Sequence, residues 1–341
     1  MKLFDSFFLK HLELRNRLVM PPMCTYQAQA CDGKVTPFHQ AHYLAPAIGG
    51  VGLVIVEATA VAPEGRISDY DLGLWCDGQI SGLRSLVEGV HATGAKIAIQ
   101  LGHAGRKCEA TNGVSSILGP SPLAYDDSYR IPEEMDEKTI NRVIDEFKQA
   151  ARRAEEAGFD AIEIHAAHGY LINQFISPAT NKRSDQYKEP SLFLSQVLQA
   201  VHATWPVEKP LWVRVSATDY SPDGYDVTYC SKVLAAIKPM IDAVHVSSGG
   251  VVPIVPPVYP GYQIAFARTI GEAVDLPVIA VGMLSSPDLA EYALQSGFAD
   301  LVAVGRGLLR NPNWLLEIAC QHQKDFLLQQ PMYLQRGFPL H

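Results

Sequence analysis

Residues 136–170, DEKTINRVIDEFKQAARRAEEAGFDAIEIHAAHGY, contain one complete helix-to-strand unit. Apolar residues recur at helical spacing from position 140 to 154, and Asp136 and Gly158 are residue types that begin and end helices. The largely apolar run at 159–164 has the composition of a short strand buried on both faces. The stretch therefore predicts an amphipathic helix followed by a strand of a parallel sheet.

The same alternation of a short apolar strand with an amphipathic helix runs along the whole chain. The predicted strands are 18–20, 51–56, 96–101, 159–164, 211–215, 243–246, 277–281 and 301–304. The predicted helices are 37–48, 79–93, 136–158, 191–204, 227–238, 264–274, 287–297 and 313–323. Long crossovers require parallel strands, and eight such units predict an α/β fold, a closed (β/α)8 TIM barrel. The alternative is a doubly wound open sheet, which predicts a Gly-x-Gly-x-x-Gly turn after an early strand, and no such turn is found there.

No stretch of linker composition divides the chain, so residues 1–341 are expected to form a single barrel domain. Residues 102–136 interrupt the alternation and are rich in Gly, Ser, Pro, Asp and Tyr. Because a loop of this length in a compact domain is usually functional, we predict that it is a cap or lid inserted after the third strand. Residues 324–341 are predicted to form a polar tail.

Composition and charge exclude several classes of function. The 341 residues are 48% hydrophobic, which is enough for a large core. The net charge of −8, without a long basic run, argues against a nucleic-acid partner. No apolar run is long enough to span a membrane. The six cysteines are scattered and form no Cys-x-x-Cys pair, which indicates reduced thiols in a cytoplasmic protein.

The turn after the strand at 159–164 carries His165, His168 and Tyr170. Two imidazoles three residues apart on a turn can point into one pocket and offer N–H groups to an oxygen that gains negative charge. Tyr170 can serve as an acid, because the ordinary pKa of a tyrosine is about 10 and its phenol is protonated at neutral pH. Two other interpretations stay open on these residues alone. The histidines can be half of a metal site, for which no third ligand is evident, or a pair of core histidines.

Polar or small residues also follow the other predicted strands, where a TIM barrel places its active site. Gly282, Gly305 and Arg306 follow the last two strands, and these positions form the usual phosphate cradle of the fold. Tight turns that need glycine are the alternative explanation. Arg214 and Gln100 offer donors and an acceptor to a flat heterocycle. A ligand with a phosphate at one end and such a ring at the other is FMN.

These residues and their surroundings resemble the old yellow enzyme family of FMN-dependent ene-reductases, also described as NADH:flavin oxidoreductases. The resemblance is closest to the bacterial thermophilic-like class and runs from Leu3 to the tail. The matching stretches are 14–17, 21–24, 56–61, 100–107, 165–171, 177–178, 181–185, 214–219, 246–250 and 304–307. The chain departs from the family where Tyr187 is followed by Lys188-Glu-Pro190 instead of Gly-Gly-Ser, so we expect a loop of different shape there.

The resemblance implies a TIM barrel that binds FMN without a covalent bond. The residues that would contact FMN are Pro21, Pro22, Met23, Cys24, Ala58, Gln100, Arg214, Gly282, Gly305 and Arg306. Cys24 would lie near the flavin ring and tune its potential. His165 and His168 would hold the activating oxygen of the substrate. Tyr170 would deliver a proton, and Tyr26 would line the substrate pocket.

The resemblance also implies an NAD(P)H-dependent ene-reductase, an NADPH dehydrogenase in the older nomenclature. Its substrates would be C=C bonds activated by a carbonyl or nitro group, as in enones, enals, maleimides and nitroalkenes. NAD(P)H and the alkene would use one cavity in turn, in a ping-pong cycle. A homodimer or homotetramer is expected, in which Arg336 of the tail reaches the substrate site of a neighbouring subunit.

Three other functions are weighed against this one. A dienoyl-CoA-reductase-like flavoenzyme would share the barrel, but such proteins continue into an iron–sulfur segment, and no cysteine cluster follows the eighth helix here. A metal-dependent aldolase or hydrolase would need a third ligand beside the two histidines. A flavin-binding redox sensor would need only FMN and Cys24.

Overall fold

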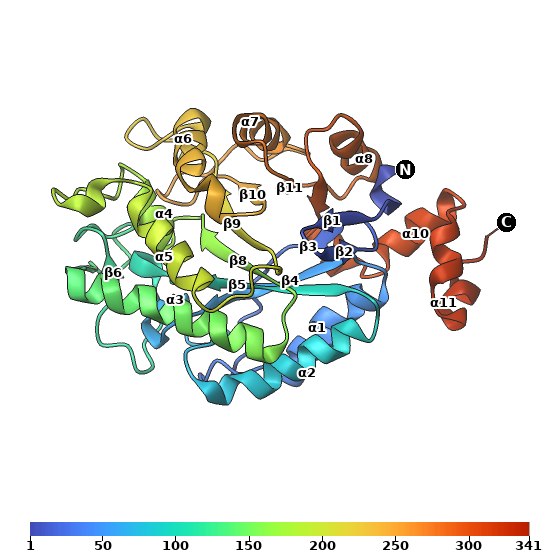
Figure 1. The fold of residues 1–341 in the computed structure, drawn as a ribbon, viewed down its shortest axis with the longest axis horizontal. Helices are drawn as coiled ribbons and strands as arrows, with labels where there is room; N and C mark the ends of the chain where they lie inside the picture. Colours follow the sequence, from blue (N-terminus) through green and yellow to red (C-terminus); the bar gives the residue numbers. More distant parts are fainter. Residues whose placement is uncertain (341) are drawn as a thin grey trace.

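The computed structural model describes residues 1–340. Its centre is a closed barrel of eight parallel strands, in the order β3, β4, β5, β8, β9, β10, β11 and β12 (Figure 1). These strands are β3 (Leu18–Met20), β4 (Leu53–Ala60), β5 (Lys96–Gly102), β8 (Ala161–Ala166), β9 (Leu211–Ser216), β10 (Val244–Ser247), β11 (Val278–Ala280) and β12 (Leu301–Ala303). The eight predicted strands and the (β/α)8 TIM barrel are confirmed.

Eight helices follow these strands and cover the outside of the barrel (Figure 1). They are α1 (Pro37–Ile48), α2 (Ile80–His91), α3 (Glu137–Ala157), α5 (Leu192–His202), α6 (Val227–Ile237), α7 (Ile264–Val274), α8 (Pro287–Gln295) and α10 (Trp314–Gln321). The ends of α3 form as its sequence predicts, because the Asp136 carboxylate accepts the Thr139 N–H at 2.7 Å and Gly158 adopts φ +93°.

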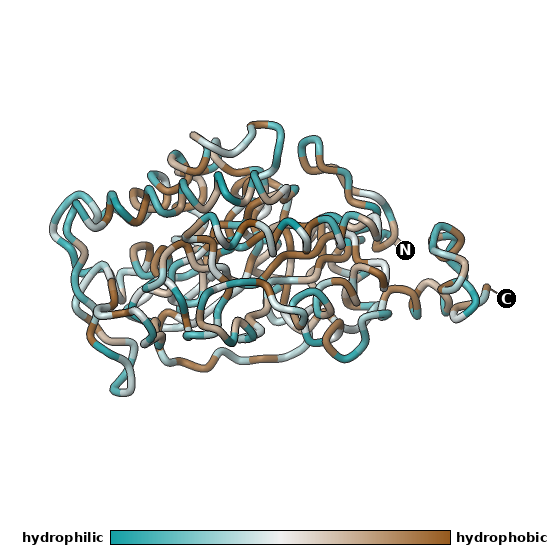
Figure 2. Tube along the Cα trace, turned by 90° about the horizontal axis from the view of Figure 1, so that it is seen from below, coloured by the Kyte–Doolittle hydropathy of each residue, from teal (hydrophilic) through white to brown (hydrophobic). Residues whose placement is uncertain are grey.

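Alternate residues of each strand pack into two separate hydrophobic layers. Val19, Leu53 and Ile55 point inward and belong to a cluster inside the barrel. Their neighbours Leu18 and Val54 belong to a larger cluster between the barrel and its helices. In Figure 2 the hydrophobic colour gathers on the central strands, while the outer turns of the helices are hydrophilic. Burial on both faces explains why the strand sequences are almost continuously apolar.

A β-hairpin closes the end of the barrel at which the strands begin. It pairs β1 (Phe7–Leu9) with β2 (Leu12–Leu14) in antiparallel register, within the segment that the sequence shows only as alternating apolar residues. Leu9, Leu12 and Leu14 join the cluster inside the barrel. The opposite end, where the strands finish, is therefore the open mouth.

The C-terminal tail contains helices for which the sequence analysis gave no prediction. The chain forms a 3-10 helix, η7 (Asp325–Gln329), and a short helix, α11 (Met332–Gly337), because Phe326 and Leu327 pack into the core and anchor it. Two further short helices were not predicted, α4 (Leu171–Ile176) and α9 (Arg306–Arg310). The remaining 3-10 helices are η1 (Lys2–Phe4), η2 (Pro63–Gly65), η3 (Asp77–Gln79), η4 (Gly105–Lys107), η5 (Gln186–Lys188) and η6 (Lys238–Met240).

Residues 102–136 contain little regular structure. Two-residue strands β6 (Leu118–Gly119) and β7 (Glu133–Glu134) pair with each other. Arg106 ties the segment together, because its guanidinium donates to the carbonyls of Leu123 at 3.2 Å and Ala124 at 3.0 Å. The segment lies at one end of the molecule in Figure 1, and the N-terminus and α11 lie at the other.

Candidate active site

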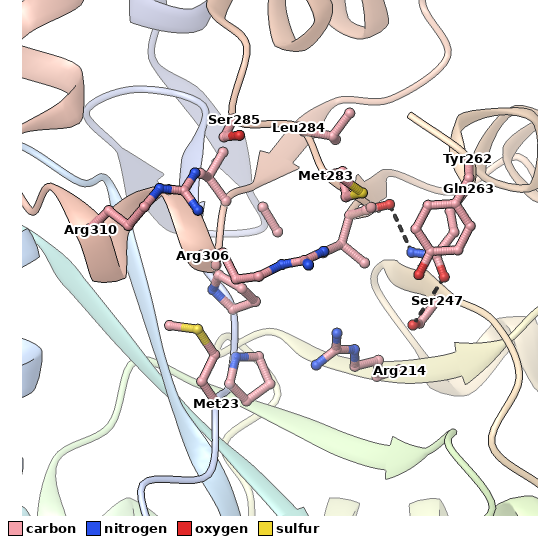
Figure 3. Close-up of a pocket in the computed structure, with 18 residues that line it drawn as sticks. Met23, Arg214, Ser247, Tyr262, Gln263, Met283, Leu284, Ser285, Arg306 and Arg310 are labelled. Carbon is pink, nitrogen blue, oxygen red and sulfur yellow. Dashed lines mark hydrogen bonds between the residues drawn. The ribbon is translucent and has the colours of Figure 1, made fainter. Parts of the chain in front are cut away.

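A cavity of about 300 Å³ opens at the carboxyl ends of β9 to β12 (Figure 3). Most of the residues predicted to contact a cofactor line it, namely Pro21, Pro22, Met23, Arg214, Gly282, Gly305 and Arg306. Sequence reasoning gave no role to several other lining residues, which include Ser247, Tyr262, Gln263, Met283 and Arg310. Ser247 lies at the end of a strand, a position from which a role in the site could have been predicted. Tyr262 and Gln263 follow a proline-rich loop, and nothing in its sequence indicates that they line a cavity.

Three arginines and no carboxylate line this cavity within the described chain, so it attracts anions. Figure 3 shows Arg214 entering from β9 and Arg306 reaching across from the start of α9. Arg214 is buried, burial lowers its pKa, and its Nε–H has no partner among residues 1–340. A buried N–H without an acceptor is costly, so this arginine calls for a ligand that supplies one.

Gly282 lets the backbone approach the cavity closely. Its φ is +128°, which side-chain-bearing residues rarely adopt, and a Cβ there would lie 3.0 Å from the Gln263 side chain. The end of β11 therefore presents bare main chain to whatever occupies the cavity. This geometry suits a phosphate, which backbone N–H groups and arginines recognise together.

His165, His168 and Tyr170 lie together at the mouth. The ring centroids of His165 and His168 are 5.2 Å apart, and those of His165 and Tyr170 are 4.9 Å apart, both in edge-to-face arrangement. His165 and Tyr170 also line a small space of about 10 Å³ beside Ala58. The turn between His168 and Tyr170 is tightly held, since a Cβ on Gly169 (φ +74°) would collide with the Gly250 carbonyl.

Backbone strain is concentrated at the same mouth. Of the eight non-glycine residues with positive φ in the described chain, four come shortly after barrel strands at this end: Tyr26, His168, Tyr220 and Met283. Such conformations cost on the order of 1–3 kcal/mol each and persist only where the surroundings hold them. The residue types at these positions do not predict the positive φ angles.

Both imidazoles are neutral at physiological pH. Burial and then the Arg214 charge lower the pKa of His165 to about 3. The same two causes hold the pKa of His168 well below its ordinary value. Burial, followed by Cys24 and Tyr26, raises the pKa of Tyr170 well above 10, so its phenol keeps its proton. The site thus offers neutral N–H and O–H donors.

The loop that carries Cys24 and Tyr26 is anchored by a buried carboxyl group. The Thr25 N–H and hydroxyl both donate to Glu57 Oε1 at 3.1 Å, and the Tyr43 hydroxyl donates to Glu57 Oε2 at 2.8 Å. The Cys24 thiol has hydrogen-bond contacts with the Ala58 backbone and with Tyr26. Burial raises the pKa of Cys24, so a reactive thiolate is scarce and a thiol-based redox sensor is not favoured.

Comparisons with known proteins bear directly on this site. A sequence profile described as the NADH:flavin oxidoreductase / NADH oxidase family matches residues 2–325. The chain is 46% identical to an NADPH dehydrogenase of Clostridium acetobutylicum over 343 aligned residues, covering 99% of this chain and 100% of that one.

The chain belongs to the NADH:flavin oxidoreductase / NADH oxidase family.

The resemblance to the old yellow enzymes is thereby confirmed, and the protein is an FMN-linked oxidoreductase that uses NAD(P)H as reductant. A solved morphinone reductase mutant in complex with tetrahydroNAD is 26% identical, with a TM-score of 0.78 over 97% of this chain and 92% of that one. A 2-naphthoyl-CoA reductase structure has a TM-score of 0.88, but at 22% identity over 95% of this chain and 52% of that one it shows the fold alone.

The residues of this old yellow enzyme relative fit FMN. Arg306 and the bare backbone at Gly282 suit the phosphate. The unpartnered Arg214 Nε–H suits an acceptor on the flavin ring. Cys24, Ala58 and Gln100 do not line the cavity of about 300 Å³. Ala58 lines the small space beside His165 instead, and the Cys24 thiol contacts the Ala58 backbone.

Gln100 belongs to a polar network inside the barrel that sequence reasoning missed. Its Nε2 donates to Glu163 Oε1 at 2.7 Å. Glu163 Oε2 accepts from Trp212 Nε1 at 2.6 Å and from His245 Nδ1 at 2.7 Å. Burial alone would raise the pKa of Glu163, but His245, Arg214 and these donors lower it to about 2. The amide of Gln100 is therefore fixed, with its oxygen free for a ligand.

The remaining predicted residues fall outside this cluster. Tyr26 is half-buried at the mouth, and this partial burial, followed by the influence of Cys24, raises its pKa. Arg336 lies exposed on α11, at the end of the molecule opposite the segment 102–136 (Figure 1). Within residues 1–340 no group of three metal-binding side chains surrounds the two histidines or any other point. No helix in the same range is both long and apolar enough to cross a membrane.

Proposed function

We propose that this protein is an NADPH-dependent ene-reductase for alkenes activated by a carbonyl or nitro group, which include enones, enals, maleimides and nitroalkenes. The observation that carries the proposal is the combination of two neutral imidazoles and one protonated phenol at the mouth of an FMN-binding barrel. These groups suit a substrate that gains negative charge on an oxygen and a proton on a carbon.

His165 and His168 bind the carbonyl or nitro oxygen of the substrate through their N–H groups. Charge that builds on this oxygen during reduction is stabilised by the two donors, and loss of one such donor typically costs about 2.7–4 kcal/mol of barrier. Burial keeps the donors in place, because His165 is only 4% exposed. When bound, FMN supplies the hydride for the β-carbon and regains it from the nicotinamide.

Tyr170 protonates the α-carbon. Its phenol stays protonated because burial raises its pKa. Lys107 Nζ lies 5.3 Å from the centre of the Tyr170 ring. Lys107 donates to the carbonyls of His168 at 3.1 Å and Gly250 at 3.3 Å, so it also ties the catalytic turn to the loop after β10. Tyr26 and Cys24 form the neighbouring wall of the substrate pocket.

FMN is held without a covalent bond by the ten predicted residues. Pro21, Pro22, Met23, Cys24, Ala58 and Gln100, at the ends of β3, β4 and β5, would contact FMN, with Cys24 near the flavin ring. Arg214 would place its cation beside the ring, and Gly282, Gly305 and Arg306 would hold the phosphate. Arg310 adds a second cation at the phosphate end of the cavity. Residues 102–136 act as a cap over the substrate side.

We further propose a homodimer or homotetramer in which the tail completes a neighbouring site. Arg336 is exposed on α11 together with Met332 and Tyr333, which are 69% and 62% exposed. Two large exposed apolar side chains beside an arginine suit a surface that another subunit covers. The position of α11 at the far end from the segment 102–136 supports action on another subunit's site (Figure 1).

The experiment is turnover of cyclohexenone with NADPH by the FMN-loaded protein. His165→Ala and His168→Ala should each lower the rate of alkene reduction about 100-fold, while FMN reduction by dithionite, which has no carbonyl to anchor, stays close to wild type. His11→Ala, exposed in the hairpin at the opposite end of the barrel, is the matched control. Wild-type protein that oxidises NADPH but leaves every activated alkene unreduced would overturn the proposal.

A further inference from the structure

We propose that Ser247 is a positioning residue that fixes the ring proton of His168 on Nδ1, so that His168 presents an N–H donor to the substrate oxygen. The inference deepens the proposed function and rests on it. It concerns a question that a neutral imidazole always raises, because only one of its two nitrogens carries a proton and only that nitrogen donates.

The backbone settles this question for His165. Its Nδ1 accepts the N–H of Ala167 at 3.3 Å, so its proton is on Nε2. No protein group within residues 1–340 is hydrogen-bonded to this Nε2, and it is not among the buried unpartnered atoms, so it faces open space. His165 therefore donates from Nε2.

His168 has the opposite arrangement. Its Nε2 lies 2.7 Å from the Ser247 hydroxyl, and its Nδ1 has no hydrogen-bond partner in the described chain and is not buried. The ring is held in this orientation by its backbone, which adopts φ +59° and donates its N–H to the Ser216 hydroxyl at 2.9 Å. Nδ1 is therefore the only nitrogen of His168 that can reach a substrate, and it donates only if Nε2 accepts from Ser247.

The direction of the Ser247 hydroxyl follows from its other neighbour, Gln263. Gln263 Nε2 donates to the Val281 carbonyl at 2.9 Å, which turns Oε1 toward Ser247 (Figure 3). Oε1 already accepts from the Ser248 hydroxyl at 2.6 Å, and the Tyr220 hydroxyl donates to Ser248 in turn. The Ser247 hydroxyl can also donate to this oxygen, at 3.3 Å, but that hydrogen bond is longer and weaker than the 2.7 Å one between Ser247 and His168 Nε2.

Ser247 therefore donates to His168 Nε2, and the two histidines carry complementary protons. His165 offers Nε2–H and His168 offers Nδ1–H, so both accessible nitrogens are donors. The alternative, with the Ser247 hydroxyl turned to Gln263, would place a lone pair of His168 against the substrate oxygen and repel it. Ser247 is only 6% exposed, so water does not compete strongly for its hydroxyl.

Nitrogen NMR on the FMN-loaded protein tests the assignment directly. Protein labelled with [15N]histidine gives separate ring signals for protonated and unprotonated nitrogens, and His168→Asn identifies the His168 pair by its loss. We expect protonated Nδ1 and unprotonated Nε2 in the wild type, and a mixture of the two forms in Ser247→Ala. A His168 proton on Nε2 in the wild type would overturn the inference.

Kinetics supply the second readout. Ser247→Ala should raise the dissociation constant of cyclohexenone and lower its reduction rate by about tenfold, as expected for one neutral hydrogen bond, after correction for the FMN content of each sample. Ser247→Thr keeps the hydroxyl and should restore most of the loss. If Ser247→Ala keeps wild-type rate and affinity per bound FMN, the inference is refuted.

The two readouts separate this inference from the proposed function. If the protein reduces no alkene but NMR finds Nδ1–H on His168 that depends on Ser247, the proposed substrate class fails and the role of Ser247 stands. If alkenes are reduced and His168 carries its proton on Nε2, the proposed function stands and the role of Ser247 falls.

Discussion

Glu163→Gln should strongly lower the stability of the folded protein. The side chain keeps its size and loses its charge at the centre of the barrel, where three donors within 2.7 Å converge on it from Gln100, Trp212 and His245. Arg214, on the neighbouring strand, contributes to the low pKa of Glu163 through its charge. The variant therefore leaves Arg214 as a buried cation without its counter-charge.

The magnitude follows from the pKa of Glu163 and from the stranded arginine. A fall in pKa from the ordinary 4.5 to about 2 in the folded protein corresponds to about 3 kcal/mol of stability. That contribution is fully present above pH 4.5 and is lost as the pH falls through 2. Removing one partner of a buried pair typically costs about 3–5 kcal/mol, so we expect a loss in this range at pH 7.

The assay is urea unfolding at equal protein concentration and a fixed excess of FMN, at pH 7 and at pH 4. The difference in unfolding free energy between wild type and Glu163→Gln should narrow by about 1 kcal/mol at pH 4, because Glu163 is then mostly protonated in the unfolded wild-type chain while it stays ionised in the folded protein. Glu155→Gln is the control, since it removes the partly exposed pair with Lys209 at 2.6 Å and should cost about 1 kcal/mol or less. The reasoning would be refuted if the unfolding free energies of wild type and Glu163→Gln differed by less than about 1 kcal/mol at pH 7, or if their difference were larger at pH 4 than at pH 7.

Three further predictions concern Tyr170 as the proposed acid, the Cys24–Tyr26 loop and the tail. Tyr170→Phe should retain FMN and slow the oxidative half-reaction with an enone about 100-fold in stopped-flow measurements, and an unchanged rate would remove Tyr170 as the acid. Burial raises the pKa of Glu57 from 4.5 to about 7, so native protein holds this proton more tightly than unfolded protein and stability falls as the pH rises from 4.5 to 7. Relative to Glu57→Gln, the unfolding free energy of the wild type should fall by about 2 kcal/mol between pH 5 and pH 8 in urea titrations. The same pH dependence of stability in both proteins would contradict this. Arg336→Ala should raise the KM for alkenes several-fold without altering FMN content, whereas wild-type kinetics in an intact oligomer would leave the tail without a role in the site.

The barrel could be predicted from the sequence because its strands are buried on both faces. Phe159–Ile164 and its seven counterparts therefore appear as short apolar runs, and the helices between them have a regular apolar stripe. The short helices α4 and α9 could not be found this way, since five or six residues are too few to display a period. The structure of the tail was missed because its apolar residues are spaced irregularly among polar ones: Phe326 and Leu327 are buried, and Leu334, Phe338 and Leu340 are partly buried against the core.

The candidate site divides in a similar way. Residues at strand ends, such as His165, Arg214 and Gly282, could be predicted because the barrel places every strand end at one mouth. Glu163 could not, because a lone acid inside an apolar strand carries no signal until its three donors are seen. The strained backbone at Tyr26 and His168 was equally hidden, since both residues occur mostly at negative φ and only tertiary contacts impose the other sign.

Arg214 connects the interior network with the chemistry at the mouth. It lies directly between His165 and His245 in the parallel register of β8, β9 and β10. Burial is the main cause of the low pKa values of His165, His168 and His245, and the charge of Arg214 lowers them further while it helps to keep Glu163 ionised. A carboxylate beside the imidazoles without this arginine would favour their protonation, and protonated imidazoles would attract any anion in solution. With Arg214 in place, the histidines remain neutral donors. Whether they bind a substrate oxygen then depends on which ring nitrogen of each histidine carries the proton. Control of tautomers rather than of charge is therefore the task left to residues such as Ser247.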